Sequence, residues 1–302
     1  MMRLANLKTD KKEEGYVGVD GGRIWYQALG SSRRASLVLL HGGPGYPHYY
    51  LQPLEEFANS MRVVFYDQLG CGKSDRSDAP GVWLIDRFVD ELDTLISFLG
   101  LRSPILFGHS WGSILALEYY LRCPEKVSAL VLASPCLSIP RWVADSRKLR
   151  KLLPDNVRSV LDAHERSGTI DAPEYRKATA EYYRQFVCRL RPKPDAVCLS
   201  DAQAGGEVYT AMWGANEFIV SGSLAGYDIT SRLNEVKVPV LYTCGLLDEA
   251  SPETTTYYQS LTPGAGLRVF QNSSHMPHWE ERTRYLTAVR EFLEAVINKT
   301  VP

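Results

Sequence analysis

The sequence lacks a long apolar run, an excess of charge of either sign, and close pairing of its cysteines. No stretch approaches the roughly 18 apolar residues that a membrane-spanning helix needs. Lys and Arg total 34 against 35 Asp and Glu, so a formal charge of −1 gives no field that would attract nucleic acid or anionic lipid. We therefore expect neither nucleic acid nor a membrane as a partner.

The six cysteines show no C-x-x-C pair and no spacing typical of a zinc site. The N-terminal segment carries Arg3, Lys8, Lys11 and Lys12 but no continuous apolar stretch, unlike a secretory signal peptide. These patterns predict free thiols, a cytoplasmic location and no metal ion.

What the chain does contain is the composition of a globular protein with a large core, 45% hydrophobic and 23% charged residues. Short apolar, β-branched runs alternate with segments whose apolar residues repeat at helical spacing, which predicts an α/β fold with a mostly parallel central sheet flanked by helices. We expect strands at 16–19, 23–27, 36–40, 62–66, 104–107, 127–133, 238–243 and 267–270, and core helices at 82–99, 114–121 and 285–297. The first two strands flank a glycine turn and should form an antiparallel hairpin.

The alternation stops between residues 138 and 228. This stretch is rich in Arg, Lys, Glu and Tyr, with helical patterns at 157–164 and 174–188 and few β-branched runs. We interpret it as a helical cap inserted into an α/β core that residues 1–137 and 229–302 form together.

The pentapeptide Gly108-His109-Ser110-Trp111-Gly112 matches the nucleophile elbow G-x-S-x-G. It lies where that motif requires, between the expected strand 104–107 and the expected helix 114–121. The sharp reversal leaves no room for a Cβ at the glycines, and the N-terminus of the helix favours negative charge beside the serine. Ser110 is therefore the predicted nucleophile.

A serine hydroxyl needs a histidine base oriented by a carboxylate, and on this fold the chain order is Ser, then Asp or Glu, then His. Asp248 follows the expected strand 238–243, and His275 follows the expected strand 267–270. Both therefore lie at the carboxyl edge of the sheet, where such folds place their sites. The alternatives are Glu249, which should point elsewhere on its loop, and His278, which enters the next helix.

The segment His41-Gly42-Gly43-Pro44-Gly45 follows the expected strand 36–40 and corresponds to the H-G-G loop that supplies one oxyanion donor. The expected donors are the backbone N–H groups of Gly43 and Trp111. The alternative is a tight turn that uses its glycines only for their backbone conformation.

Together these motifs resemble those of the proline iminopeptidases, or prolyl aminopeptidases, of the α/β-hydrolase superfamily, and the tricorn-interacting aminopeptidase type in particular. The resemblance runs from about residue 16 to the end. It departs from the family pattern at Leu69, where an arginine is common, and at His109, where a glycine is common; both bear on proline specificity more than on fold. The segments that carry it are 41–45, Asp67-Gln68-Leu69-Gly70-Cys71-Gly72-Lys73-Ser74, 108–113, Met212-Trp213-Gly214-Ala215-Asn216-Glu217-Phe218 and 245–249.

The resemblance implies the α/β-hydrolase fold and a serine aminopeptidase that releases an N-terminal proline or another apolar residue from short peptides through an acyl-enzyme, without a cofactor. It also implies that Glu217 and Glu249 hold the free amino group of a small peptide or aminoacyl substrate. An apolar first residue needs an apolar pocket, for which Trp213 and Phe218 are candidate walls, together with Trp111, Trp142 and Trp279.

Other functions remain open from the sequence. An amino-acid amidase, an aminoacyl ester hydrolase or an aminoacyl transferase would use the same acyl-enzyme. A ligand-binding receptor on the same scaffold would use no chemistry at all, because function depends on the site and not on the fold.

Overall fold

The computed structural model describes residues 12–30, 35–77 and 83–300. It contains an eight-stranded sheet in the order β1-β2-β4-β3-β5-β6-β9-β10. The first two strands form the expected hairpin, and β2 pairs with β4 antiparallel, whereas all later pairs are parallel. The strands are β1 (Glu13–Val19), β2 (Gly22–Leu29), β3 (Ser36–Leu40), β4 (Arg62–Tyr66), β5 (Ile105–His109), β6 (Ala129–Ala133), β9 (Val240–Gly245) and β10 (Gly266–Phe270). The predicted mostly parallel sheet is thus confirmed.

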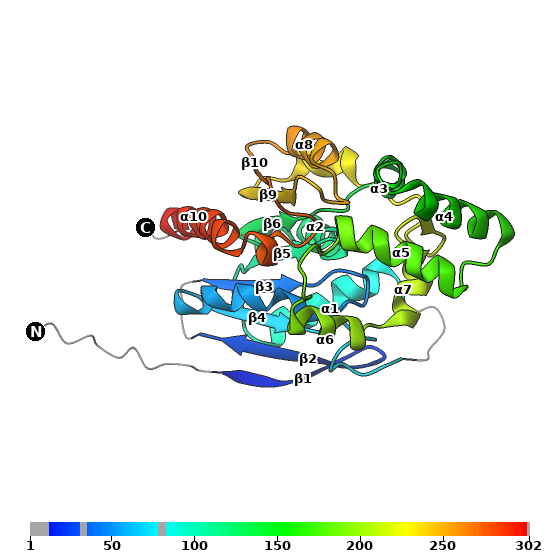
Figure 1. Ribbon diagram of the computed structural model, residues 1–302. Helices are drawn as coiled ribbons and strands as arrows, with labels where there is room; N and C mark the ends of the chain where they lie inside the picture. Colours follow the sequence, from blue (N-terminus) through cyan, green and yellow to red (C-terminus); the bar gives the residue numbers. More distant parts are fainter. Residues whose placement is uncertain (1–11, 31–34, 78–82, 301–302) are drawn as a thin grey trace, which may run out of the picture.

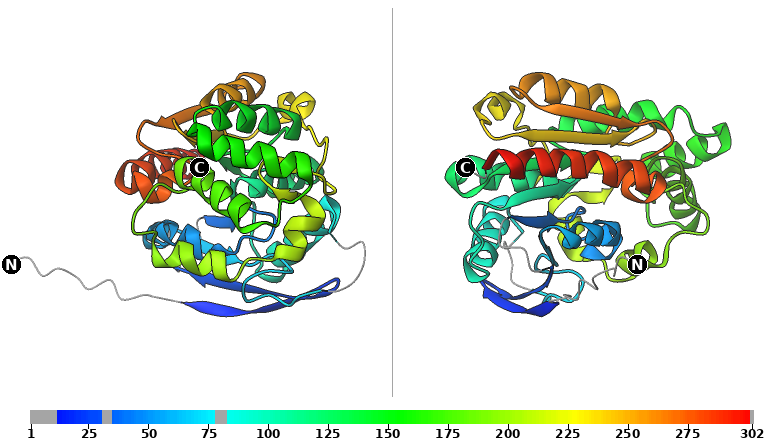
Figure 2. Two further views of the ribbon diagram at one scale, coloured as in Figure 1. Left: turned by 45° about the vertical axis from the view of Figure 1, so that its right-hand side comes forward. Right: turned by 90° about the vertical axis from the view of Figure 1, so that its left-hand side faces the viewer.

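Helices cover both faces of this sheet (Figure 1), and Figure 2 shows α10 lying along one of them. One face carries α1 (Ile85–Phe98), α2 (Trp111–Arg122) and α8 (Pro252–Leu261). The other carries the 3-10 helix η1 (His48–Asn59) and α10 (Arg282–Thr300). Residue 82, the expected start of the first helix, lies outside the described residues.

Strand β3 shows why the expected strands appear as continuous apolar runs. Val38 and Leu40 belong to the core on one face, and Leu37 and Leu39 belong to the core on the other. Because parallel strands are buried on both faces, alternation with polar residues is absent from their sequences. This burial explains why short apolar runs between helical patterns predicted the strands of the core.

The chain between β6 and β9 forms helices at the edge where the parallel strands end (Figure 1). It has an apolar cluster of its own, which includes Leu161, Tyr182 and Phe186. An isolated β-bridge joins Ser138 to Asp228, and the Ser138 hydroxyl donates to the Asp228 carboxylate at 2.7 Å, so the two ends of the segment meet. Its elements are α3 (Ile139–Arg150), α4 (Asp155–Ser167), α5 (Pro173–Phe186), α6 (Asp195–Ala202), α7 (Gly206–Met212), β7 (Gly214–Asn216) and β8 (Ile219–Val220).

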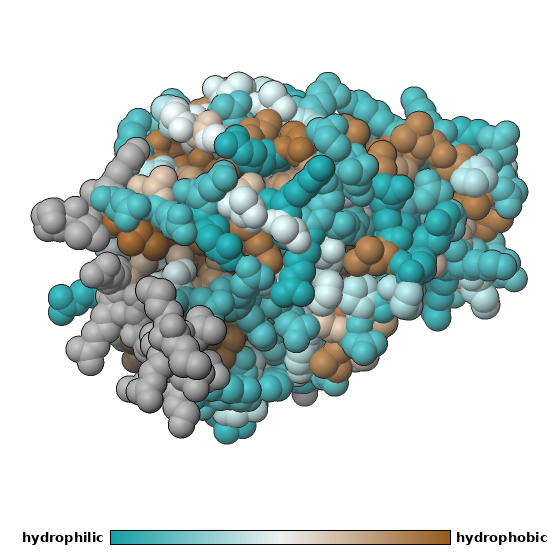
Figure 3. All heavy atoms as spheres, turned by 60° about the vertical axis from the view of Figure 1, so that its left-hand side comes forward, coloured by the Kyte–Doolittle hydropathy of each residue, from teal (hydrophilic) through white to brown (hydrophobic). Residues whose placement is uncertain are grey.

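The remaining elements are short: η2 (Pro124–Lys126), η3 (Thr230–Glu235) and α9 (Pro277–Glu280). Hydrophilic side chains dominate the face drawn in Figure 3, and apolar ones form small scattered patches there. Within the described ranges, no helix combines the length and the apolar character that crossing a membrane would require.

Candidate active site

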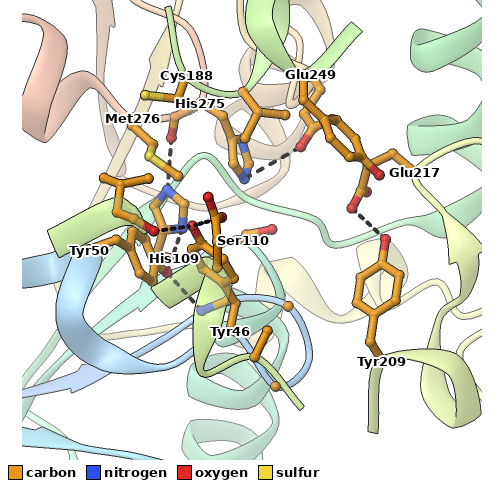
Figure 4. A pocket seen from close by; sticks show the side chains of 18 of the residues that line it. Tyr46, Tyr50, His109, Ser110, Cys188, Tyr209, Glu217, Glu249, His275 and Met276 are labelled. Carbon is orange, nitrogen blue, oxygen red and sulfur yellow. Dashed lines mark hydrogen bonds and ion pairs between the residues drawn. The ribbon is translucent and has the colours of Figure 1, made fainter. Parts of the chain in front are cut away.

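A pocket of about 500 Å³ opens at the carboxyl edge of the sheet. Its walls come from loops that follow the core strands and from the segment between β6 and β9. Ser110, His109, His275, Glu217 and Glu249 all line it, and Figure 4 shows them around one space. The structure therefore brings the predicted nucleophile, base and amine-binding residues together.

Ser110 occupies the turn between β5 and α2 with φ 54° and ψ −121°, a conformation that L-residues rarely adopt. Close backbone packing imposes this turn. A Cβ at Gly108 would lie 2.2 Å from the Gly112 carbonyl oxygen, and one at Gly112 would lie 2.1 Å from the Leu40 carbonyl oxygen. Both positions therefore require glycine, and the turn presents the Ser110 side chain to the pocket.

His275 is paired with Asp248 through its Nδ1 atom, which lies 2.6 Å from Asp248 Oδ1. A carboxylate can only accept a hydrogen bond, so Nδ1 carries the proton. The other ring nitrogen, Nε2, then keeps a lone pair with which to accept a proton from a serine.

The Asp248 carboxylate is fully enclosed and receives three more hydrogen bonds. Oδ2 accepts from the Ser134 hydroxyl at 2.7 Å and from the Gly245 N–H at 3.2 Å, and Oδ1 accepts from the Ala250 N–H at 2.8 Å. Ser134, which directly follows β6 with φ 46°, was not predicted from the sequence. The signal that could have found it is a polar residue at the carboxyl end of a buried strand.

The two alternative residues have other partners. Glu249 Oε1 lies 3.9 Å from Nε2 of His275, on the pocket side of the ring and away from Nδ1. His278 is fully buried, and its Nε2 lies 3.1 Å from the Tyr50 carbonyl oxygen, to which it donates. Burial lowers the pKa of His278 to about 3, so it stays neutral. The geometry thus favours Asp248 and His275.

The glycine loop after β3 touches the nucleophile. A Cβ at Gly42 would lie 3.1 Å from Ser110 Cβ, and Gly43 adopts φ 111°, which only glycine adopts without strain. Trp111 is the first residue of α2, so its N–H lies at the positive end of a helix. Both predicted oxyanion donors therefore flank Ser110.

A buried network that the sequence did not predict joins this loop to the histidine loop. The Tyr50 hydroxyl accepts from the Gly42 N–H at 2.8 Å and lies 2.9 Å from His109 Nδ1. His109 Nε2 lies 2.8 Å from the His275 carbonyl oxygen, which can only accept, so His109 carries its proton on Nε2 and the Tyr50 hydroxyl donates to Nδ1. Tyr50 and His109 thus tie the glycine loop, the nucleophile turn and the histidine loop into one unit.

The acidic side of the pocket holds two carboxylates that pair with no Lys or Arg among the residues the structure describes. Tyr209 donates to Glu217 Oε1 at 2.7 Å, whereas Glu249 is 3% exposed and its Oε2 has no hydrogen-bond partner among the described residues. Burial raises the pKa of Glu217, and burial together with the neighbouring Glu217 and Asp248 carboxylates raises the pKa of Glu249 well above its usual range. Two such groups form a site for a positive charge.

The aromatic residues Trp213 and Phe218 lie behind the pocket and do not line it. The Trp213 indole is buried and donates to the Asn216 carbonyl oxygen at 3.1 Å. The Phe218 ring packs edge-on against Tyr182 at 4.6 Å, with the Arg150 guanidinium on it. Trp213 belongs to the main core cluster and Phe218 packs against the cluster of the inserted segment, whereas the tyrosines that line the pocket are Tyr46, Tyr50, Tyr183 and Tyr209.

His41, Asp67 and Cys71 form a buried group whose ligand atoms lie within 4.8 Å of one another. These atoms already have partners: His41 Nε2 accepts from the Gln68 N–H at 2.9 Å, and Asp67 accepts from the Lys73 N–H at 2.9 Å. The group therefore braces the loop after β4 and offers no free set of ligands.

Comparisons with known proteins agree with this geometry. Residues 35–282 match the family described as alpha/beta hydrolase fold. The chain is 41% identical over 287 residues to a proline iminopeptidase of Heyndrickxia coagulans, covering 94% of this chain and 99% of the relative. It is 36% identical to a proline iminopeptidase of Saccharolobus solfataricus, covering 94% and 93% of the two chains.

Solved structures give the same result. The crystal structure of VinJ superposes with a TM-score of 0.91 at 35% identity, covering 95% of this chain and 100% of that one. The proline iminopeptidase of Mycobacterium smegmatis superposes with a TM-score of 0.88 at 34% identity, covering 95% and 99%. The chain therefore belongs to the proline iminopeptidase family of α/β hydrolases.

Proposed function

We propose that this protein is a serine aminopeptidase that releases an N-terminal proline, or another apolar residue, from short peptides. One observation carries the proposal: two buried carboxylates, Glu217 and Glu249, which pair with no Lys or Arg of the described residues, face the same pocket as Ser110 and His275. The names of its relatives, proline iminopeptidase, support the same reaction.

The reaction proceeds through a covalent ester. Ser110 Oγ attacks the first peptide carbonyl carbon while His275 Nε2 takes its proton, and Asp248 keeps the imidazole in the right tautomer. The N–H groups of Gly43 and Trp111 bind the oxygen that becomes negative. His275 then gives the proton to the leaving amine, and it deprotonates the water that hydrolyses the ester.

The two glutamates select the substrate by its free amino group. An ammonium ion held between them offsets the negative charge that burial and mutual repulsion otherwise disfavour at this pair of carboxyl groups. Because Glu217 comes from residues 138–228, we treat this segment as a cap that completes the pocket on the core formed by 1–137 and 229–302. The position of the ammonium relative to Ser110 then limits cleavage to the first residue.

An amidase, an aminoacyl ester hydrolase or an aminoacyl transferase would use the same groups, and the leaving group or acceptor distinguishes them. A ligand-binding receptor would not need the strained Ser110 turn or the Asp248–His275 pair. Labelling of Ser110 by a fluorophosphonate would separate the enzymes from the receptor, since only an activated serine reacts.

The decisive experiment compares Glu217→Gln and Glu249→Gln with wild type. The substrates are prolyl-naphthylamide, its N-acetylated form and p-nitrophenyl acetate. Each substitution should lower kcat/KM for the free amine roughly 30-fold to several thousandfold. This corresponds to a loss of about 2 to 5 kcal/mol in transition-state stabilisation, the usual cost of truncating one partner of a buried charge pair. Hydrolysis of the ester, which has no ammonium, should hardly change, and wild type should not cleave the acetylated substrate.

The matched control is Glu207→Gln, because Glu207 is an exposed glutamate in the first turn of α7 outside the pocket. It should cleave all substrates like wild type. Equal losses on the amine and the ester in the Glu217 and Glu249 variants would contradict the proposal, since the glutamates would then support only the shape of the site.

A further inference from the structure

The pocket carries opposite charges on its two sides. Glu217 and Glu249 lie on one side of Ser110 in Figure 4, and Cys188 and Met276 lie on the other. Three cationic side chains belong to the wall near Cys188: Arg184, Arg191 and Lys193. If the ammonium of a substrate occupies the acidic side, the part beyond the scissile bond extends toward this second side.

The second side is held close to the histidine by backbone contacts. The His275 N–H donates to the Phe186 carbonyl oxygen at 3.1 Å, which fixes the end of α5 against the histidine loop. Cys188 follows two residues later, and Arg191 Nη1 donates to its carbonyl oxygen at 3.3 Å. The Arg191 guanidinium is therefore anchored to the stretch of chain that also holds His275.

Two of the three cations already have acidic partners. Arg184 forms a two-pronged ion pair with Glu181, whose pKa falls to about 2 chiefly because of this contact. Lys193 Nζ lies 2.7 Å from Asp201 Oδ2. Their charges are therefore largely neutralised within the protein.

Arg191 is different. Its recorded hydrogen bonds go from Nη1 to the carbonyl oxygens of Cys188 and Leu190, and no carboxylate in the described part of the chain lies within ion-pair distance of it. The residue is exposed and lines the pocket, and the two hydrogen bonds to carbonyl oxygens use only Nη1. An unpaired guanidinium at the wall of a pocket is suited to a planar, bidentate anion such as a carboxylate.

We propose that Arg191 binds the C-terminal carboxylate of the substrate, so that the preferred substrates are dipeptides and tripeptides with a free C-terminus. This inference rests on the proposed aminopeptidase function. Val187, Cys188 and Val197 also line this pocket, and their apolar side chains suit the residue after the scissile bond. A pocket of about 500 Å³ is sized for a small ligand, and a short peptide carries both charges that it recognises.

The test measures kcat/KM for prolyl-alanine and prolyl-alanyl-alanine, for the C-terminal amides of both, and for prolyl-naphthylamide, which has no carboxylate. Wild type should prefer each free acid over its amide by about tenfold, the value of a hydrogen bond to a charged group. R191Q should abolish this preference by lowering the rate on the acids alone. R191K, which keeps the charge, should restore part of it.

The matched control is R189Q, because Arg189 is an exposed arginine of the same loop that does not line the pocket. Its acid-to-amide ratio should equal that of wild type. The inference is overturned if wild type cleaves acids and amides equally, if R191Q slows both alike, or if R189Q acts like R191Q. Cleavage of prolyl-naphthylamide without any preference for acids would overturn this inference alone, whereas failure to cleave every substrate would overturn the proposed function and this inference together.

Discussion

The two sides of the Ser110 pocket differ in how completely their polar atoms are satisfied. On the side of the base, Asp248 receives four hydrogen bonds and His275 is fixed through Nδ1. On the amine side, Glu249 Oε2 is buried and has no hydrogen-bond partner among the described residues within the ordinary distance limit, and burial raises the pKa of both Glu217 and Glu249.

This difference separates groups that are prepared in advance from groups that await a ligand. Leaving a buried polar atom unpaired costs about 1 to 3 kcal/mol, so the amine side lowers the stability of the empty protein. A bound ammonium would recover part of that free energy. The side that performs chemistry is rigid before the substrate arrives, and the side that recognises the substrate is completed by it.

The largest effect should come from substituting the residues on the side of the base. Asp248→Asn should lower kcat by about 10⁴-fold, because an amide donates where a carboxylate accepts and so favours the wrong tautomer of His275. Ser110→Ala and His275→Ala should be at least as severe, and combining them should add little since they act as a unit. Steady-state kinetics and circular dichroism check activity and fold; near-normal turnover of His275→Ala with loss in His278→Ala would refute the assignment.

A smaller effect should follow from removing one hydrogen bond of the Tyr50–His109 network that supports the side of the base. Tyr50→Phe removes the hydroxyl that accepts from the Gly42 N–H and donates to His109, so the glycine loop loses its tie to the nucleophile turn. We expect kcat to fall about tenfold on peptide and ester substrates alike, with KM little changed, because the glycine loop then holds the oxyanion of the transition state less well. Tyr49→Phe, at the neighbouring and partly exposed tyrosine, is the control; a loss confined to KM would argue against a positioning role.

The smallest expected effect concerns the amine side and is a change in the free energy of unfolding with pH. The pKa of Glu249 is raised in the folded protein above its ordinary value of 4.5, so the folded state holds this proton more tightly than the unfolded chain does. Its contribution to stability is therefore greatest below pH 4.5 and is lost as pH rises toward the folded pKa. In Glu249→Gln the side chain cannot ionise, so this decrease in the free energy of unfolding with rising pH is absent.

The variant should accordingly become more stable than wild type as pH rises, by about 1 to 3 kcal/mol at pH 8. Urea unfolding at pH 5, 6.5 and 8 measures the difference, with Glu207→Gln as the control that should not change. A gap in the free energy of unfolding that stays constant with pH would show that the Glu249 carboxylate is not under this constraint.

The sequence predicted the core well and the inserted segment less completely. Strands such as β3 and β5 are recognisable as continuous buried apolar runs, and the long helix α1 buries enough apolar residues for its helical period to be visible. Helices α6 and α7 span two turns each and bury two residues apiece, which is too few to define a period. Their positions depend on packing against the core.

The site shows the same division. Ser110, Asp248 and His275 lie in loops that follow strands β5, β9 and β10, so motif and spacing were sufficient to predict these three positions. Ser134 meets Asp248 because β6 and β9 lie side by side, and Tyr50 meets Gly42 and His109 because β3 and β5 do; no local pattern states that order. Aromatic residues such as Trp213 suit a core as well as a pocket, so composition could not place them.

The chain leaves the core after β6 and returns at β9, and these two strands are direct neighbours, with Leu130 opposite Val240. The segment between them is therefore an insertion whose two ends are joined by the β-bridge between Ser138 and Asp228. Because its length has no effect on the register of the sheet, evolution can lengthen, shorten or exchange this stretch without changing the order of the strands that carry Ser110 and His275. The reaction can therefore stay the same in this fold while changes in the inserted segment alter which substrate is bound.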